Sequence, residues 1–186
     1  MTRIGIIAAG GESRRTGLGA YTTKAALPLL GRSLLAHQLA FLQRSGVSRA
    51  LVICRPEHAR LLGSRLSPEE RAMVAFIFSD KSTGWAGEVE RALPFIGNED
   101  EVVLVSCDNY HASAAETLHE GDALFTCTYW DYVAPPAERV LARGPSVWGT
   151  GGDAWIERVG QGFTGDFFSG YVVVRGNTLA QGLHDL

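Results

Sequence analysis

Hydrophobic residues follow two alternating patterns along this chain, and the alternation predicts the order of its elements. Short apolar runs are typical of buried strands, whereas apolar residues that recur every three or four positions are typical of helices with one buried face. Strands are predicted at 3–9, 50–54, 74–78, 102–106, 123–129, 139–142, 154–159 and 171–174. Helices are predicted at 33–45, 56–66, 83–93, 113–120 and from 178 to the end, with a short helical turn from 67.

Local signals define the helix at 33–45 best. Ser33 is a favourable N-cap, and Gly46 ends the apolar periodicity. The leucines of its predicted buried face are Leu34, Leu35, Leu39 and Leu42.

The order of the elements predicts the fold class. Strands and helices alternate over the first two thirds, which predicts a three-layer, Rossmann-like α/β fold: a mainly parallel sheet with helices on both faces. The last third is richer in strands and predicts a short antiparallel part. At 186 residues we expect a single domain, 1–186. Ligands of open α/β sheets bind beyond the carboxyl ends of the strands, where Gly10, Ser79-Asp80 and Asp108 stand.

Composition narrows the class of function. The net charge of −3 and the absence of a basic stripe argue against nucleic-acid binding. No stretch is long enough to span a membrane, and the apolar run at 4–9 is too short for a signal-peptide core. Cys54, Cys107 and Cys127 form neither a disulfide framework nor a zinc pattern. We therefore expect a cytoplasmic protein.

The segment after the first strand has the composition of a phosphate-binding loop. Backbone amides of small residues approach phosphate oxygens closely, an arginine forks two donors onto phosphate, and a lysine adds a compact charge. The candidates for nucleotide contacts here are Ala8, Ala9, Gly10, Gly11, Glu12, Ser13, Arg14, Arg15 and Lys24. The spacing is neither that of a Walker A loop nor GxGxxG. Taken alone, the loop is equally well explained as a turn.

Two further strand ends carry candidate residues. Asp108 follows a strongly apolar strand, and a carboxylate in such a place suits Mg²⁺; capping a turn is the alternative role. After the third strand, Ser79, Asp80 and Gly84 precede or begin a predicted helix, for which Thr83 is a candidate N-cap.

The run from Ile6 to Pro28 resembles the signature of the sugar-phosphate and choline-phosphate nucleotidyltransferases. The matching positions are Ala8, Ala9, Gly10, Ser13, Arg14, Leu18, Lys24, Leu27 and Pro28. The triplet Asp108-Asn109-Tyr110 is similar to the metal-binding segment of choline-phosphate cytidylyltransferases. Glu12 departs from the pattern, because the family usually has glycine there, and this puts the loop geometry in question.

The resemblance implies an enzyme that transfers NMP from an NTP to a small phosphate- or phosphonate-bearing acceptor and releases pyrophosphate. It implies that Lys24 binds the α-phosphate and the acceptor phosphate, Arg14 with Arg15 holds the pyrophosphate, and Asp108 binds Mg²⁺. Ser79, Asp80 and Gly84 would lie near the base and sugar. Residues 1–111 would form the NTP-binding part and 112–186 the acceptor-binding part.

Several alternatives stay open. The Asp-Asn-Tyr triplet and the short acceptor region favour a small acceptor with CTP, and the lack of glutamine near Gly87 disfavours a dTTP-specific sugar enzyme. A sugar-1-phosphate nucleotidyltransferase is the alternative within the enzyme class. A non-catalytic nucleotide-binding or regulatory domain is the alternative outside it. The resemblance also implies a second metal-binding carboxylate, for which Asp131, Asp166, Asp185 or a partner subunit are candidates. The oligomeric state, a homodimer included, is left open.

Overall fold

The computed structural model describes residues 2–11, 22–80, 84–107, 111, 114–115, 123–125, 146–149, 156–160, 166–167 and 171–184. The chain divides into two compact units. The first combines Met1–Leu124 with Val172–Leu186, and the second is Phe125–Tyr171.

A six-stranded sheet, in the order β5-β4-β1-β6-β11-β7, forms the centre of the first unit. Its strands are β1 (Arg3–Ala8), β4 (Arg49–Cys54), β5 (Val74–Phe78), β6 (Glu101–Ser106), β7 (Ala123–Phe125) and β11 (Tyr171–Arg175). The four from β5 to β6 are parallel. Their apolar runs, predicted as strands, are buried in β1, β4 and β6. The predicted three-layer, mainly parallel architecture is confirmed.

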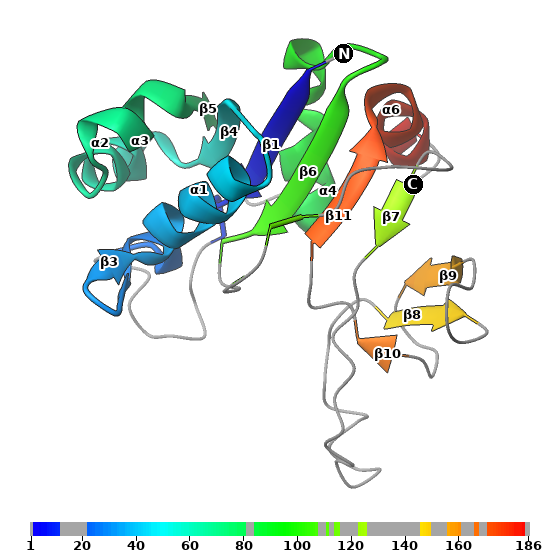
Figure 1. The fold of residues 1–186 in the computed structure, drawn as a ribbon, viewed down its shortest axis with the longest axis horizontal. Helices are drawn as coiled ribbons and strands as arrows, with labels where there is room; N and C mark the ends of the chain where they lie inside the picture. The colour runs from blue at the N-terminus through cyan, green and yellow to red at the C-terminus, as the bar shows by residue number, and fades with distance from the viewer. Residues whose placement is uncertain are drawn as a thin grey trace, which may run out of the picture. The chain divides into compact units, whose positions relative to one another are not determined.

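Strand β11 is antiparallel to its neighbour β6, as Figure 1 shows. Just past the end of β11, the amide of Gly176 donates to the carbonyl of Asp100, just before the start of β6, over 3.0 Å. The end of one strand therefore lies beside the beginning of the other. The chain thus returns late in the sequence to place a strand between β6 and β7.

Helices lie on both faces of this sheet (Figure 1). Figure 1 shows α1 in front of the sheet and α4 behind it, and α4 contacts both β1 and α6. The helices are α1 (Leu34–Arg44), α2 (Pro56–Ser64), α3 (Pro68–Met73), α4 (Gly84–Glu90) and α6 (Gly176–His184), with short 3-10 turns at η2 (Lys24–Ala26) and η3 (Leu93–Phe95).

Helix α1 forms as its sequence predicts. The Ser33 hydroxyl accepts a hydrogen bond from the amide of Ala36 (3.1 Å), which satisfies one of the unpaired donors of the first turn. Leu35, Leu39 and Leu42 are fully buried, whereas Leu34 is half-buried. The helix packs so closely on β1 that a Cβ at Gly5 would lie 2.5 Å from Leu42 Cδ1.

A tight hairpin not predicted from the sequence precedes α1. Strands β2 (Pro28–Leu29) and β3 (Arg32–Ser33) pair antiparallel around Leu30 and Gly31, whose φ angles are +49° and +80°. Two consecutive positive φ angles are typical of the two-residue turns that match the twist of paired strands.

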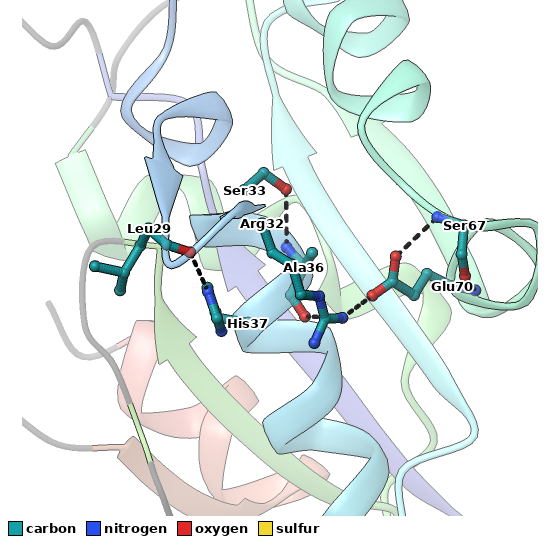
Figure 2. Close-up of polar contacts among 7 residues, drawn as sticks. All are labelled: Leu29, Arg32, Ser33, Ala36, His37, Ser67 and Glu70. Carbon is teal, nitrogen blue, oxygen red and sulfur yellow. Dashed lines mark hydrogen bonds and ion pairs between the residues drawn. The ribbon is translucent and has the colours of Figure 1, made fainter.

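Side chains from two helices hold this hairpin in place, as Figure 2 shows. The Arg32 guanidinium forms an ion pair with Glu70 of α3 and also donates to the carbonyl of Ala36. Glu70 itself completes a capping box with Ser67. His37 Nε2 donates to the carbonyl of Leu29 over 2.7 Å. The segment leading into α1 is thereby tied to α1 and α3.

The second unit contains a three-stranded antiparallel sheet in the order β10-β8-β9. Its strands are β8 (Ser146–Gly149), β9 (Ile156–Gly160) and β10 (Asp166–Phe167), with an irregularity between Trp148 and Gly149. The predicted antiparallel character of this region is confirmed, and β9 lies close to the strand predicted at 154–159. β8 and β10 were not predicted, and the strand predicted at 139–142 lies outside the described residues.

The remaining elements agree with the sequence within a few residues. The helix predicted at 83–93 is α4 followed by η3, and that predicted from 178 begins at Gly176. Of the helix predicted at 113–120, only 114–115 are described, and Thr83 is outside the described residues. None of the helices that the structure describes has the length and apolar character needed to cross a membrane.

Candidate functional site

The four parallel strands end side by side, which defines one edge of the sheet as the carboxyl edge. Ala8 pairs with Ile53 on one side and with Ser106 on the other, and Cys54 pairs with Phe78. Two amides extend this pairing beyond the strands: Ala9 N–H donates to Ile53 O (2.8 Å) and Ser79 N–H to Cys54 O (2.9 Å). The segments that follow β1, β5 and β6 therefore leave from the same edge, where ligands of such sheets bind.

Gly10 makes a close contact with a buried carboxylate. Its amide donates to Glu88 Oε2 over 3.2 Å, and only 4% of Glu88 is exposed. A Cβ at Gly10 would lie 2.7 Å from Glu88 Oε1, so no other residue fits without a shift. The amides of Ala9 and Gly10 are thus both engaged inside the protein. Gly11 differs: it is exposed, and a Cβ there would meet nothing within 4 Å.

The surroundings of Glu88 affect two titrating groups. Burial raises the pKa of Glu88, while the Gly10 amide and the charges of Arg55 and Arg91 act in the opposite direction. Burial, together with the negative charges of Glu57 and Glu88, raises the pKa of the Cys54 thiol to about 12. Cys54 therefore stays protonated at neutral pH and is not an activated nucleophile.

Lys24 begins the short turn η2, which packs against α1 and α2. At the far end of α1, the Arg3 guanidinium at the start of β1 donates to the carbonyl of Ser45, so α1 runs back along β1 and its first turn lies toward the carboxyl edge. Leu34 in that first turn donates to the carbonyl of Leu27, just after η2, over 3.0 Å. The backbone of half-buried Lys24 is thereby held near the carboxyl edge.

The segment after β5 was predicted to lie near the base and sugar of a nucleotide. Ser79 is buried and bonded to β4, whereas the side chain of Asp80 is exposed. Helix α4 then begins at Gly84 and contacts β1. Ser79 and Asp80 therefore follow β5 at the carboxyl edge, and Gly84 begins the helix that carries Glu88.

Five predicted site residues lie outside the described residues: Glu12, Ser13, Arg14, Arg15 and Asp108. So do two candidates for a second metal ligand, Asp131 and Asp185. The third, Asp166, begins β10, of which only the backbone is described. The structure thus brings the ends of β1 and β6 and the start of α4 to one edge, with η2 nearby. The arginines and Asp108 remain predictions.

The chain that follows Asp108 is tied to α1. Arg44 donates to the carbonyl of His111 (2.9 Å), whose ring lies 4.6 Å from that of Phe41. The amide of Ala115 donates to Ser45 Oγ over 2.7 Å. Partial burial lowers the pKa of His111. These contacts hold His111 and Ala115 beside the last turn of α1.

The donors available for a divalent cation are of the right kind. Magnesium takes oxygen ligands, often one or two carboxylates with substrate phosphates. Asp108 comes two positions after Ser106, which ends β6 beside Ala8 of β1, so a carboxylate follows the strand next to the candidate phosphate-binding loop. Among the described residues, no three histidine, cysteine, aspartate or glutamate side chains gather into a ligand set.

Glu88 is the residue at this edge to which the sequence pattern assigned no role. It stands at the end of the segment 79–88, whose other residues were considered for contacts with the base and sugar. Buried Val89 follows it directly, but adjacent helical residues do not share a face, so this neighbour gave no sign that Glu88 is buried too. Its hydrogen-bond donor, Gly10, lies 78 positions away and no local pattern indicates it.

Comparison with solved structures agrees with this architecture. Inositol-1-phosphate CTP transferase from T. maritima superposes with a TM-score of 0.72 at 16% identity, over 96% of this chain and 73% of that one. CTP:phosphocholine cytidylyltransferase from Streptococcus pneumoniae gives 0.67 at 14% identity, over 99% and 75%. UDP-glucose pyrophosphorylase in complex with UDP-glucose gives 0.69 at 12% identity, over 96% and 78%. At these identities the likeness shows a shared fold.

The sequence itself defines the family. No curated protein sequence matches the chain significantly. The family model of the MobA-like NTP transferase domain, however, matches residues 5–130, which is 126 of the 186 residues and includes most of β1, the loop after it, Lys24 and β6. This agrees with the resemblance seen in the run from Ile6 to Pro28, and the chain belongs to the MobA-like NTP transferase domain family.

Proposed function

We propose that this protein is a nucleotidyltransferase that moves NMP from an NTP, with CTP favoured, to a small phosphate- or phosphonate-bearing acceptor and releases pyrophosphate. The observation that carries the proposal is the register of β1 and β6. Because Ala8 pairs with Ser106, the loop that contains Arg14 and the segment that contains Asp108 leave adjacent strands at one edge. η2, with Lys24, is held near the same edge.

In this reaction an acceptor oxygen attacks the α-phosphorus in line while pyrophosphate leaves on the opposite side. The protein's part is to position the two reactants and to stabilise the charge that develops between them. Lys24 would bind the α-phosphate and the incoming acceptor phosphate. Arg14, with Arg15, would hold the departing pyrophosphate through paired donors. A Mg²⁺ ion held by Asp108 would add positive charge at the phosphate oxygens.

The exposed surroundings of Gly11 support a nucleotide at this place. The chain there is open to solvent and carries no side chain, so a phosphate can approach the backbone closely. Immediately before it, the amides of Ala9 and Gly10 are bonded to β4 and α4, which makes the base of the loop a rigid support. In this proposal Gly11 and the residues after it make the phosphate contacts.

The preference for CTP and a small acceptor rests on sequence and on relatives. The segment Gly84-Trp85-Ala86-Gly87 has no glutamine, which disfavours dTTP. Two of the structural neighbours use CTP by their names, with phosphocholine or inositol 1-phosphate. Likeness to UDP-glucose pyrophosphorylase keeps a sugar 1-phosphate as the second candidate acceptor class.

A pyrophosphate-release assay tests the proposal. The purified protein is incubated with Mg²⁺, one of CTP, UTP, ATP, GTP or dTTP, and one of three acceptor classes: an amino-alcohol phosphate, a phosphonate or a sugar 1-phosphate. We expect release with CTP and one of the first two classes, and its loss when EDTA is added. Release confined to sugar 1-phosphates would move the assignment to the second candidate. NTP binding without release for any acceptor would indicate a non-catalytic nucleotide-binding domain.

A further inference from the structure

Glu88 and Gly10 form a contact between two segments of the candidate site. The amide of Gly10 donates to one carboxylate oxygen of Glu88 over 3.2 Å. The other oxygen occupies the space that a Cβ on Gly10 would need, 2.7 Å from the ideal Cβ position. The carboxylate therefore contacts the loop after β1 in two ways, by a hydrogen bond and by packing.

This contact is an unusual place for a carboxylate if only stability is considered. Glu88 is 4% exposed, and burial disfavours its charged form, as its raised pKa reflects. The charges of Arg55 and Arg91 offset the burial in part. Val89, the next residue of α4, is a fully buried apolar side chain, so this helix places apolar residues in the protein interior. What the carboxylate supplies beyond an apolar residue is an acceptor for the loop.

We propose that Glu88 is a positioning residue, which holds the loop after β1 through Gly10 in the orientation that binds the triphosphate. The inference rests on the proposed function, because it assigns the loop to the nucleotide. Glu88 acts through Gly10. The hydrogen bond and the packing fix the orientation of Gly10, and this orientation sets the direction in which Gly11 leaves the sheet edge.

The location of Glu88 in α4 gives the contact a second consequence. α4 begins at Gly84, in the segment expected near the base, and four residues later it holds the loop expected near the phosphates. One short helix thus links both ends of the nucleotide site. Loss of the link should therefore raise the KM for the NTP and leave the KM for the acceptor nearly unchanged.

The experiment compares side chains of similar size that differ in whether they can accept a hydrogen bond from the Gly10 amide. Glu88→Gln keeps an acceptor for the Gly10 amide, whereas Glu88→Met fills the same space without a comparable one. Glu90→Met, two residues along α4 and exposed, is the matched control. We expect Glu88→Met to raise the KM for the NTP about tenfold, the size expected for loss of a hydrogen bond to a charged group. Glu88→Gln should stay within about threefold by the same reasoning, and Glu90→Met should match the wild type.

A second pair of variants tests the packing half of the contact. Gly10→Ala places a methyl group against the carboxylate and should raise the KM for the NTP. Gly10→Ala combined with Glu88→Ala removes the obstacle, so the double variant should lose less than the sum of the two single losses. Additive losses would contradict a direct contact between these two residues.

Amide hydrogen exchange separates this inference from the proposed function. The Gly10 amide should exchange faster in Glu88→Met than in the wild type, in Glu88→Gln or in Glu90→Met. If no pyrophosphate is released by the wild type, the proposed function fails, and the affinity for NTP measured by calorimetry replaces KM. The role assigned to Glu88 would be overturned if the Gly10 amide exchanged at the same rate in all variants. It would also be overturned if Glu88→Met lowered the melting temperature and weakened the binding of NTP and acceptor by the same factor.

Discussion

The carboxylates at the two edges of the central sheet differ in the contacts that they make. At the amino edge, Glu101 forms a largely buried ion pair with Arg3 (2.9 Å), and Asp100 accepts the amides of Thr2 (2.9 Å) and Gly97 (2.8 Å). Those amides lower the pKa of Asp100. At the carboxyl edge, burial raises the pKa of Glu88, which meets a single loop amide in the hydrogen bonds described.

These different surroundings indicate that the amino edge serves stability and the carboxyl edge serves binding. At the amino edge Glu101 is held in an ion pair, and the amides that Asp100 accepts favour its charged form, so these contacts contribute to the free energy of unfolding. The carboxyl edge leaves Gly11 exposed and keeps a carboxylate where its charge is disfavoured. We therefore expect substitutions at the amino edge to change stability alone, and substitutions at the carboxyl edge to change activity first.

Loss of Glu101 should have the largest effect. Glu101→Ala leaves the buried Arg3 charge without its partner, which typically costs about 3–5 kcal/mol of unfolding free energy. Urea unfolding followed by circular dichroism measures this. Glu101→Gln, which keeps an acceptor for Arg3, should lose less. An unchanged urea midpoint in Glu101→Ala would show that the amino edge is not stabilised by this pair.

Loss of Lys24 should lower activity and leave stability nearly unchanged. Lys24→Ala should lower kcat/KM about a hundredfold, by analogy with removal of one transition-state donor, which is about 2.7 kcal/mol in activation free energy. Its melting temperature should stay within a degree or two of the wild type, in the range of a surface substitution. Arg49→Ala, an exposed cation at the start of β4, is the control at the opposite edge. Unchanged turnover in Lys24→Ala would remove that residue from the mechanism.

Gly176 tests how tightly the amino edge is packed. A Cβ there would lie 2.2 Å from the carbonyl oxygen of Gly97, so Gly176→Ala must displace the backbone. Overpacking of this kind costs about 1–3 kcal/mol, or about 2–4 °C of melting temperature per kcal/mol in a chain of this size. Gly182→Ala in the same helix has open space and serves as the control. Loss of activity without loss of stability in Gly176→Ala would contradict the division between the edges.

Asp100 should give the smallest effect and a defined pH dependence. Its folded-state pKa lies below the ordinary value of 3.8, so the stability it contributes is present above that value and is lost as the pH falls through the folded pKa. Asp100→Asn should therefore melt slightly lower than the wild type at pH 7, and the difference should shrink below pH 3.8. A difference that grows on acidification would mean that these amides do not favour the charged carboxylate.

The sequence predicted the parallel part of the fold well because its signals are local. Apolar runs marked β1, β4, β5 and β6 to within a residue, and Ser33 marked the start of α1. The hairpin before α1 was missed because its turn is Leu30-Gly31, where such turns usually have Asn-Gly. The place of β11 between β6 and β7 depends on pairing far along the chain, which periodicity does not encode.

The candidate site divides in the same manner. The loop after β1 and Lys24 could be identified from residue type and spacing, and the matched family covers both. The burial of Glu88 could not, because the acceptor and its amide donor are 78 residues apart and meet only through packing of α4 on the sheet. The hydrogen bonds of the Ala9 and Gly10 amides could not be predicted either, because their acceptors lie in β4 and α4, far away in the sequence.

The late position of β11 also bears on how the protein is made. In the described sheet β11 lies between β6 and β7, and its first residue is translated 65 residues after the last residue of β6. Until then β6 has an open side with unpaired backbone groups, which is a site for wrong pairing between nascent chains. Synthesis of this protein should therefore be sensitive to chaperones that shield exposed strands until β11 has been translated.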